Sequence, residues 1–273
     1  MRTRRWAISC GVMLLLLAAP LAGGSHTALG CTAPQEMTRF TVPLSNAARA
    51  IRAGKALVTV AIGSSSTVGV GASDPTHAYP ALLAEELRRR WPTLAVTVIN
   101  KGVGGEMAFQ MLARFERDVL PYHPQLVIWQ TGSNQALKSE DIDGYAGTVR
   151  EGISRLKAAG IDIVLMDPQF APRVLARPMY PLIVDSIGTV AKDMKVAVFR
   201  RFAVMRHWIS SGQYKMEDII SSDGLHMNDL SYSCISRLLA NSLAAAAEPG
   251  ERPQVYSKHN QPGVTVQYAP SGQ

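Results

Sequence analysis

Features that would indicate several other protein classes are missing from this sequence of 273 residues. It contains no dense run of lysine and arginine, so its net charge of +7 does not indicate a nucleic-acid-binding protein. No internal repeat of solenoid length is present. Neither 69–71 nor 102–105 completes a dinucleotide-binding glycine motif, and the histidines other than His226 lack metal-ligand spacing. We therefore expect no nucleic acid, cofactor or metal.

The N-terminal segment has the pattern of a secretory signal peptide. A basic start, Met1–Arg5, precedes an apolar stretch over 12–24 that is too short for an ordinary membrane-spanning helix. We expect residues 1–30 to be a signal peptide that is cleaved near residues 24–30. The protein is then periplasmic or secreted, with no integral membrane span after cleavage. Cleavage lowers the net charge to +4, because three arginines and no acids are removed.

Only three cysteines are present, and Cys10 belongs to the expected signal peptide. Cys31 and Cys234 could form a disulfide in an oxidising compartment, or both could stay unpaired. A lipid anchor at Cys31 is a third possibility, because Ala28–Cys31 partly matches a lipoprotein cleavage site. The sequence leaves these three possibilities open.

The C-terminal segment 248–273 is rich in proline, glycine and glutamine and has no sustained apolar periodicity. This composition predicts a disordered tail. The folded domain is then expected over 35–247, a length sufficient for one domain with a substantial core.

Short apolar runs rich in β-branched residues predict strands that are buried on both faces, as in a parallel sheet. They cover 57–62, 94–99, 125–130, 161–166 and 196–199. Segments with helical spacing lie at 78–90, 107–119, 141–158, 180–193 and 229–247. The alternation predicts an α/β fold: a three-layer α/β/α sandwich with a doubly wound, mostly parallel sheet of five strands.

Four polar segments should meet at the carboxyl edge of this sheet. Residues 63–66 supply serine hydroxyls, 100–106 supply glycine backbone, 131–135 supply an asparagine amide, and 222–228 contain an aspartate three residues before a histidine. Acyl transfer needs these groups. A histidine can take the proton of a serine, an aspartate can orient the imidazole, and preset N–H donors can stabilise an oxyanion.

These segments resemble the four motif blocks of the SGNH hydrolases, also called the GDSL esterase and lipase family. The blocks G-D-S-x-x-x-G, N-x-G-x-x-G, G-x-N-D and D-x-x-H correspond to Gly63–Gly69, Asn100–Gly105, Gly132–Gln135 and Asp223–His226. Each block is weak alone, but all four occur in the family's order and at suitable intervals. The resemblance implies a flavodoxin-like SGNH fold over most of 57–240.

The resemblance also implies a role for each matched residue. Ser65 would be the nucleophile, His226 the base and Asp223 the acid that orients the imidazole. The oxyanion hole would be formed by the backbone N–H groups of Ser65 and Gly105 and by the amide of Asn134. No metal or other cofactor is implied.

Two residues depart from the family pattern, because Ser64 stands where the family has an aspartate and Gln135 replaces the aspartate of the third block. Neither is required for the proton relay, but Ser64 or Ser66 becomes an alternative nucleophile. Ser65 could also be a turn serine, His226 a capping residue and Asn134 an Asx-turn residue.

Other residues have simpler expectations. Tyr79 and His77 could line the substrate pocket, and segment 168–182 could form a rim over it. Core positions are expected for Met107, Phe109, Met111, Phe115 and Trp129. Solvated positions are expected for most of Arg173, Arg177, Arg200, Arg201 and Arg206.

Three functions are compatible with these observations. The first is an exported serine esterase that hydrolyses acyl esters, including O-acetyl esters, of small molecules or glycans. The second is an envelope polysaccharide O-acyltransferase that uses the same site. The third is an inactive carbohydrate-binding protein of the same fold, which the changes at Ser64 and Gln135 suggest.

Overall fold

The computed structural model describes residues 30–138 and 141–248. The expected signal peptide, apart from Gly30, and the expected tail, apart from Glu248, lie outside the described residues. From Cys31 onward, the described residues belong to one compact unit.

Five parallel strands form the single sheet of the described residues, in the order β2-β1-β3-β4-β5. Their bounds are β1 Leu57–Gly63, β2 Val96–Gly102, β3 Leu126–Gln130, β4 Asp162–Met166 and β5 Ala197–Phe199. Every residue of β3 is buried, as is all of β1 except Val58. The predicted three-layer fold with a doubly wound, mostly parallel five-stranded sheet is therefore confirmed, and the strand order found here is the flavodoxin-like one.

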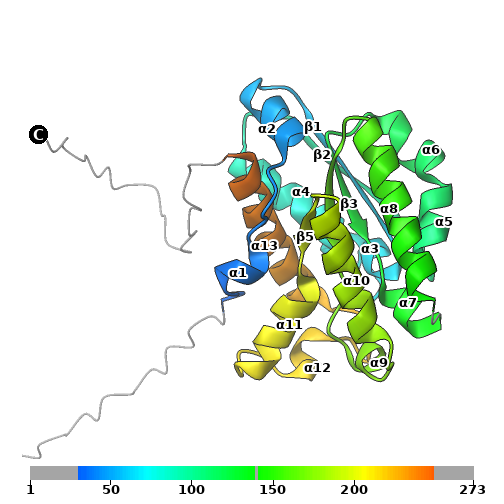
Figure 1. Cartoon of the computed structure of the whole chain (residues 1–273). Helices are drawn as coiled ribbons and strands as arrows, with labels where there is room; N and C mark the ends of the chain where they lie inside the picture. The colour runs from blue at the N-terminus through cyan, green and yellow to red at the C-terminus, as the bar shows by residue number, and fades with distance from the viewer. Residues whose placement is uncertain (1–29, 139–140, 249–273) are drawn as a thin grey trace, which may run out of the picture. The chain divides into compact units, whose positions relative to one another are not determined.

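Two helical layers cover the sheet (Figure 1). One face carries α2 (Ser45–Arg52), α4 (Tyr79–Arg90), α11 (Arg201–Ser210) and α13 (Asp229–Ala247). The other carries α5 (Ala108–Ala113), α6 (Phe115–Asp118), α8 (Ile142–Ala158) and α10 (Tyr180–Asp193). Short helices occupy the connections: α1 Gln35–Thr38, α3 Ser65–Val68, η1 Pro75–His77, η2 Leu120–Tyr122, α7 Ser133–Lys138, α9 Pro172–Leu175 and α12 Met216–Ile219.

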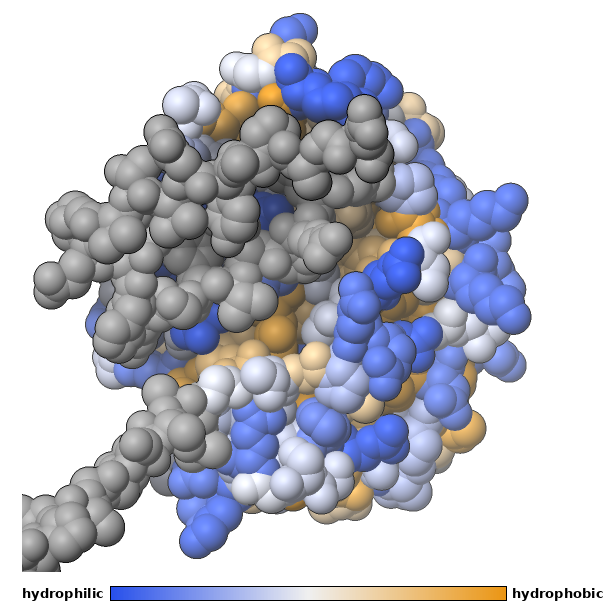
Figure 2. Space-filling model, turned by 90° about the vertical axis from the view of Figure 1, so that its left-hand side faces the viewer, coloured by the Kyte–Doolittle hydropathy of each residue, from blue (hydrophilic) through white to orange (hydrophobic). Residues whose placement is uncertain are grey.

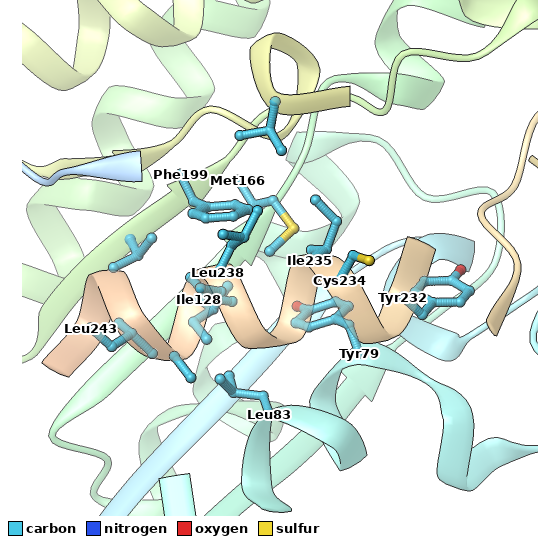
Figure 3. Close-up of a cluster of buried hydrophobic side chains, with 14 of the residues drawn as sticks. Tyr79, Leu83, Ile128, Met166, Phe199, Tyr232, Cys234, Ile235, Leu238 and Leu243 are labelled. Atoms are coloured by element: carbon cyan, nitrogen blue, oxygen red, sulfur yellow. The ribbon is translucent and has the colours of Figure 1, made fainter. Parts of the chain in front are cut away.

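The core on the first face is built around α13. Figure 3 shows Ile235 and Leu238 of this helix next to Met166 and Phe199 at the ends of two strands. Tyr79, at the start of α4, packs into the same cluster and is fully buried. Burial in this cluster is the main source of stability for α13, which follows the His226 segment directly. The expectation that Tyr79 lines a substrate pocket is therefore wrong.

The core on the second face contains Trp129 of β3. Its ring meets Phe115 edge to face, with the ring centroids 5.0 Å apart. A Cβ atom on Gly152 would lie only 2.4 Å from the Trp129 ring, so this glycine lets α8 pack closely against the sheet.

The segment 107–119 differs from its prediction in two ways. It forms two short helices, α5 and α6, separated at Arg114. The buried positions of α5 are Ala108, Met111 and Leu112, which places Phe109 on the opposite face, where it is 55% exposed. Phe109 is thus not a core residue.

The N-terminal end of the described chain is attached to α13. Cys31 and Cys234 form a disulfide with their Cα atoms 5.1 Å apart. Trp208 of α11 donates a hydrogen bond from Nε1 to the carbonyl oxygen of Thr32, at 2.8 Å. Of the possibilities that the sequence left open for these cysteines, the structure contains the disulfide.

On the side of the molecule shown in Figure 2, hydrophilic and hydrophobic residues are interspersed wherever the surface is drawn in colour. This is the side of α13, most of whose apolar residues are buried. Within residues 30–138 and 141–248, no helix combines the length and the apolar character needed to cross a membrane.

Candidate active site

The segment after β1 forms a tight turn from strand to helix. Ser64 has an extended backbone and precedes α3, so Ser65 is the first residue of this one-turn helix. A Cβ atom on Gly63 would lie 2.1 Å from Thr67 Oγ1, and one on Gly102 would lie 2.3 Å from the Val68 nitrogen. The two glycines therefore allow α3 to sit directly against the carboxyl ends of β1 and β2.

The three consecutive serines of this turn have different partners. Ser64 is buried and donates from Oγ to Gln130 Oε1 at 3.2 Å. Ser66 is also buried, and its Oγ lies 3.3 Å from Gln169 Oε1. Only Ser65 directs its hydroxyl to an imidazole among these three, with Oγ 2.8 Å from His226 Nε2. The geometry thus favours Ser65 over the two alternative nucleophiles.

His226 lies between Ser65 and Asp223. Its Nδ1 atom is hydrogen-bonded to Asp223 Oδ2. Because an ionised carboxylate only accepts hydrogen bonds, Nδ1 is the donor in this bond. With the ring proton on Nδ1, Nε2 is the atom that can accept the Ser65 proton. The ring is largely buried, with 10% of the side chain exposed. The structure therefore brings together all three residues of the predicted relay.

Asp223 is held in its ionised form by hydrogen bonds. Its Oδ1 accepts from the Ser221 hydroxyl at 2.8 Å and from the backbone N–H groups of Leu225 and His226 at 2.8 and 2.9 Å. Burial would raise the pKa of Asp223, but these bonds and the one from the His226 ring outweigh it and hold the pKa well below its usual range.

The histidine segment also packs against the chain that follows α3. A Cβ atom on Gly71 would lie 2.3 Å from the Met227 carbonyl oxygen, so this glycine permits close contact between the two segments. Tyr232, in the first turns of α13, donates to the carbonyl oxygen of Val70 at 2.8 Å. These contacts connect the serine turn to the start of α13.

The predicted oxyanion residues lie on two neighbouring segments. Gly105 has a φ of +78°, a conformation that favours glycine. Asn134, the second residue of α7, donates from Nδ2 to the carbonyl oxygen of Glu106 at 3.0 Å. The backbone N–H of Val103 donates to the carbonyl oxygen of Gly63 at 2.9 Å. This bond places the segment that contains Gly105 beside the turn that contains Ser65. Gly105 and Asn134 are thus brought together at the same edge as Ser65.

The two departures from the family motif have local explanations. Gln130, at the end of β3, accepts hydrogen bonds at Oε1 from the Ser64 backbone N–H, from the Ser64 hydroxyl and from Thr67 Oγ1, at 2.9, 3.2 and 3.0 Å. Gln135 is buried and donates from Nε2 to the carbonyl oxygen of Asp141 at 3.3 Å. Ser64 and Gln135 therefore both have hydrogen-bond partners, although neither is the aspartate of the family motif.

Sequence reasoning missed a buried polar group below the site, formed by Gln169, Arg201 and Asp167. Arg201 is fully buried and donates from Nε to the Asp167 carbonyl oxygen at 3.0 Å. It is the exception to the expectation that most of the five arginines are solvated, because the other four are exposed. Burial raises the pKa of the Asp167 carboxyl to about 7, although the Phe202 N–H and the charge of Arg201 oppose this shift. Asp167 and Gln169 follow directly after β4, so the expectation that polar residues after the strands meet at the carboxyl edge also applies to them.

His77 is exposed in part and belongs to a separate polar cluster. Its Nδ1 atom lies 2.6 Å from Ser73 Oγ and 3.2 Å from both Asp74 and Asp229. Across residues 30–138 and 141–248, no group of three or more histidine, cysteine, aspartate or glutamate side chains is arranged to hold a metal ion.

Comparison with known proteins gives consistent matches. The model of the non-GDSL lipase-like family matches residues 30–249. An acetylxylan esterase from Geobacillus stearothermophilus is 28% identical over 142 residues, which are 48% of this chain and 61% of the relative. An arylesterase from Vibrio mimicus is 25% identical over 165 residues, or 60% of this chain and 78% of the relative.

A solved structure of a two-domain esterase active on acetylated mannans, crystallised with mannopentaose, has the same fold. Its TM-score is 0.65 with 21% identity, and the match covers 77% of this chain and 55% of that one. This chain thus spans about three fifths of the acetylxylan esterase and little more than half of the two-domain esterase.

Proposed function

Because this chain belongs to the non-GDSL lipase-like family and has the SGNH (GDSL) hydrolase fold, we propose that it is a serine esterase that hydrolyses acyl esters. One observation carries the proposal: the Ser65 hydroxyl lies 2.8 Å from Nε2 of an imidazole whose Nδ1 faces Asp223. This is the arrangement that converts a weak nucleophile into a reactive one.

The first half of the proposed reaction forms an acyl-enzyme. Ser65 Oγ attacks the ester carbonyl carbon while His226 Nε2 takes the hydroxyl proton, and the Asp223 carboxylate stabilises the imidazolium that results. The negative charge on the substrate oxygen is stabilised by the N–H groups of Ser65 and Gly105 and by the amide of Asn134. His226 then protonates the departing alkoxide, and the C–O ester bond breaks.

The second half returns the enzyme to its starting state. His226 Nε2 takes a proton from water, and the resulting hydroxide attacks the acyl carbon. The Ser65–acyl bond breaks as the imidazolium returns its proton to Ser65 Oγ, and the carboxylic acid leaves. A sugar hydroxyl in place of water would make the same chemistry an acyl transfer.

The intact hydrogen-bonded chain supports an active enzyme over an inactive binding protein. The replacements at Ser64 and Gln135 leave the Ser65, His226 and Asp223 contacts in place. We propose that Ser64 and Gln130 shape the nucleophile turn here, through the bonds they share.

The proposed substrate class is an acetyl ester, including esters on a glycan. The similarity to an acetylxylan esterase and to an esterase active on acetylated mannans supports this class. Free acetate released from acetylated xylan and mannan, measured alongside transfer to an added unacetylated glycan, distinguishes hydrolysis from transfer. We expect acetate release to dominate.

We propose that the protein is exported to the periplasm or the medium. The basic and apolar N-terminal pattern supports a cleaved leader, and the Cys31–Cys234 disulfide is typical of an oxidising compartment. A disulfide at Cys31 leaves no thiol for a lipid, so we favour a mature form without an anchor. Non-reducing peptide mapping should recover Cys31 joined to Cys234, and a lipid thioether on Cys31 would contradict this.

Replacement of Ser65 tests the proposed reaction. Ser65→Ala should abolish turnover of a small chromogenic acetate ester and labelling by a fluorophosphonate, while circular dichroism shows a folded protein. Ser154→Ala is the control, because this exposed serine on α8 only donates to the Arg150 carbonyl oxygen and should keep wild-type activity. Undiminished turnover by Ser65→Ala would refute the proposal.

A further inference from the structure

Gln169 lies on the carboxyl side of β4 and is 1% exposed. Its Oε1 atom accepts hydrogen bonds from the Ser66 hydroxyl at 3.3 Å, from the Ser133 hydroxyl at 2.8 Å and from Arg201 Nη2 at 3.0 Å. Its Nε2 atom donates to the carbonyl oxygen of Leu225 at 3.0 Å. One buried amide thus connects four separate segments of the chain.

Three of these partners are the chain neighbours of residues in the proposed site. Ser66 follows Ser65, Ser133 precedes Asn134, and Leu225 precedes His226. The segments are far apart in sequence: Ser66 and Gln169 are separated by 103 positions, and Gln169 and Leu225 by 56. Gln169 therefore contacts the nucleophile turn, the start of α7 and the histidine segment at the same time.

Arg201 determines which way the amide points. A guanidinium group only donates hydrogen bonds, so the atom that faces Arg201 Nη2 must be the amide oxygen. The amide nitrogen then faces the Leu225 carbonyl, which only accepts. Arg201 is itself held by its Nε bond to the Asp167 carbonyl oxygen. The hydrogen bond from the buried Arg201 thus fixes the orientation of the Gln169 amide.

We propose that Gln169 is a positioning residue for the esterase reaction: it holds the Ser65, Asn134 and His226 segments in register through one amide whose orientation Arg201 sets. The proposal rests on the proposed function. It has a physical basis because proton transfer between Ser65 and His226 depends steeply on their separation, and displacement by about 1 Å can cost a hundredfold in rate.

Gln169→Glu removes one contact and keeps the others. The glutamate has the same shape, and a carboxylate oxygen still accepts from Ser66, Ser133 and Arg201. Its second oxygen cannot donate, so it faces the Leu225 carbonyl oxygen and repels it. We expect kcat to fall at least tenfold with KM changed less than threefold, because the proton relay is displaced while the substrate surface is kept.

Gln125→Glu is the matched control. Gln125 lies at the opposite edge of the sheet, where Oε1 accepts from the Val58 N–H at 2.8 Å and Nε2 donates to the His123 carbonyl oxygen at 3.1 Å. The same substitution there also loses one donor to a carbonyl. We expect its kcat to stay within twofold of wild type. An equal loss in both variants, or no loss at Gln169, would overturn the proposal.

The proton on His226 Nδ1 gives a second measurement that does not depend on turnover. Its NMR resonance should shift or broaden in Gln169→Glu and stay unchanged in Gln125→Glu. If wild-type protein hydrolyses no ester, the proposed function fails, while an unchanged resonance in Gln169→Glu refutes the positioning role separately.

If Gln169→Glu does not fold, a milder variant tests the same proposal. Ser133→Ala removes a single donor to Gln169 and should lower kcat about threefold or more. Ser242→Ala is its control, because this buried serine on α13 donates only to the Leu238 carbonyl oxygen. Wild-type kcat in Ser133→Ala would contradict the proposal.

Discussion

The two edges of the parallel sheet use buried or half-buried polar side chains for different purposes. At the amino edge, Asp162 accepts hydrogen bonds from the backbone N–H groups of Asn46 and Ala47 at 2.8 and 2.9 Å, which caps α2. Gln125 joins two backbone groups at the same edge. At the carboxyl edge, Gln130 and Gln169 instead bond mainly to hydroxyl and guanidinium groups of other side chains.

This difference between the edges suggests that polar side chains at the amino edge contribute mainly to stability, and those at the carboxyl edge mainly to the proposed function. Side chains at the amino edge satisfy backbone groups that would otherwise be left without partners, so their loss should cost stability. Side chains at the carboxyl edge bond to the segments that carry the proposed site, so we expect their loss to cost activity.

Cavity volume does not identify the proposed site. A cavity of about 500 Å³ lies at the amino edge, lined in part by Arg49, Lys55, His123 and Ile161. It contains none of the residues proposed for the reaction. The chemistry of the side chains, and not the size of the hollow, therefore distinguishes the two edges.

Apart from Ser65→Ala, the largest effect on activity is expected for Asp223→Asn at the carboxyl edge. An asparagine has no negative charge to stabilise the imidazolium and can present its NH2 group to Nδ1, which would favour the wrong tautomer of His226. We therefore expect kcat to fall by about a thousandfold or more, as in other relays of this type. The variant should also lose some stability at pH 7, because the lowered pKa of Asp223 means that its ionised form stabilises the folded state, so kcat is measured on protein shown to be folded. Wild-type kcat in this variant would remove the proposed role of Asp223.

The largest effect on stability is expected for the double variant Cys31→Ser and Cys234→Ser. The disulfide closes a loop of 203 residues, and its loss should lower the free energy of unfolding by about 2–4 kcal/mol. Denaturant titration measures this change. We expect kcat of the folded protein to stay within twofold of wild type, and a larger fall would show that the disulfide also maintains the carboxyl edge.

A smaller loss of stability is expected for Asp162→Ala at the amino edge. The substitution removes the cap of α2 and should lower the free energy of unfolding by about 1–2 kcal/mol with kcat unchanged. Chemical denaturation and an esterase assay on the same preparation check both parts. A tenfold fall in kcat would contradict the claim that side chains at the amino edge affect stability and not activity.

The smallest effect concerns Asp118 and depends on pH. Hydrogen bonds from Arg117 and Arg114, against the opposing effect of burial, lower the pKa of this carboxyl to about 2. A lowered pKa stabilises the folded state above the unfolded pKa of about 4, and that contribution is lost as the pH falls toward 2. Solvent screening limits it to less than about 1 kcal/mol. Asp118→Asn should therefore differ from wild type at pH 7 and converge with it near pH 2.

Regular elements with a simple apolar pattern were predictable. The buried strands are short runs of β-branched residues, and α8, α10 and α13 begin within one residue of their predicted starts. Helix α11 was missed because a buried arginine occupies its first core position: Arg201, Val204, Met205 and Trp208 share one face at helical spacing. A charged residue at such a position conceals the amphipathic pattern.

The proposed site was predictable in its residue types, because acyl transfer requires a hydroxyl, a base, an acid and oxyanion donors. The partners of those residues were not. Gln130 and Gln169 belong to no recognisable motif, and their amides bond to groups that are distant in sequence. The sequence likewise does not determine whether Cys31 and Cys234 form a disulfide, because that depends on how close the fold brings them.

Residue order and chemistry alone predicted the layered fold, because it follows from local apolar patterns, and they predicted which residue types an acyl-transfer site requires. The resemblance to the SGNH motif blocks then singled out Ser65, His226 and Asp223 as the candidates. The tertiary structure decided which of three adjacent serines faces the imidazole, which groups Ser64 and Gln135 bond to, and that a buried glutamine joins the segments of the proposed site. Those outcomes depend on distances between residues that the chain brings together only when it folds, and no local pattern encodes a distance.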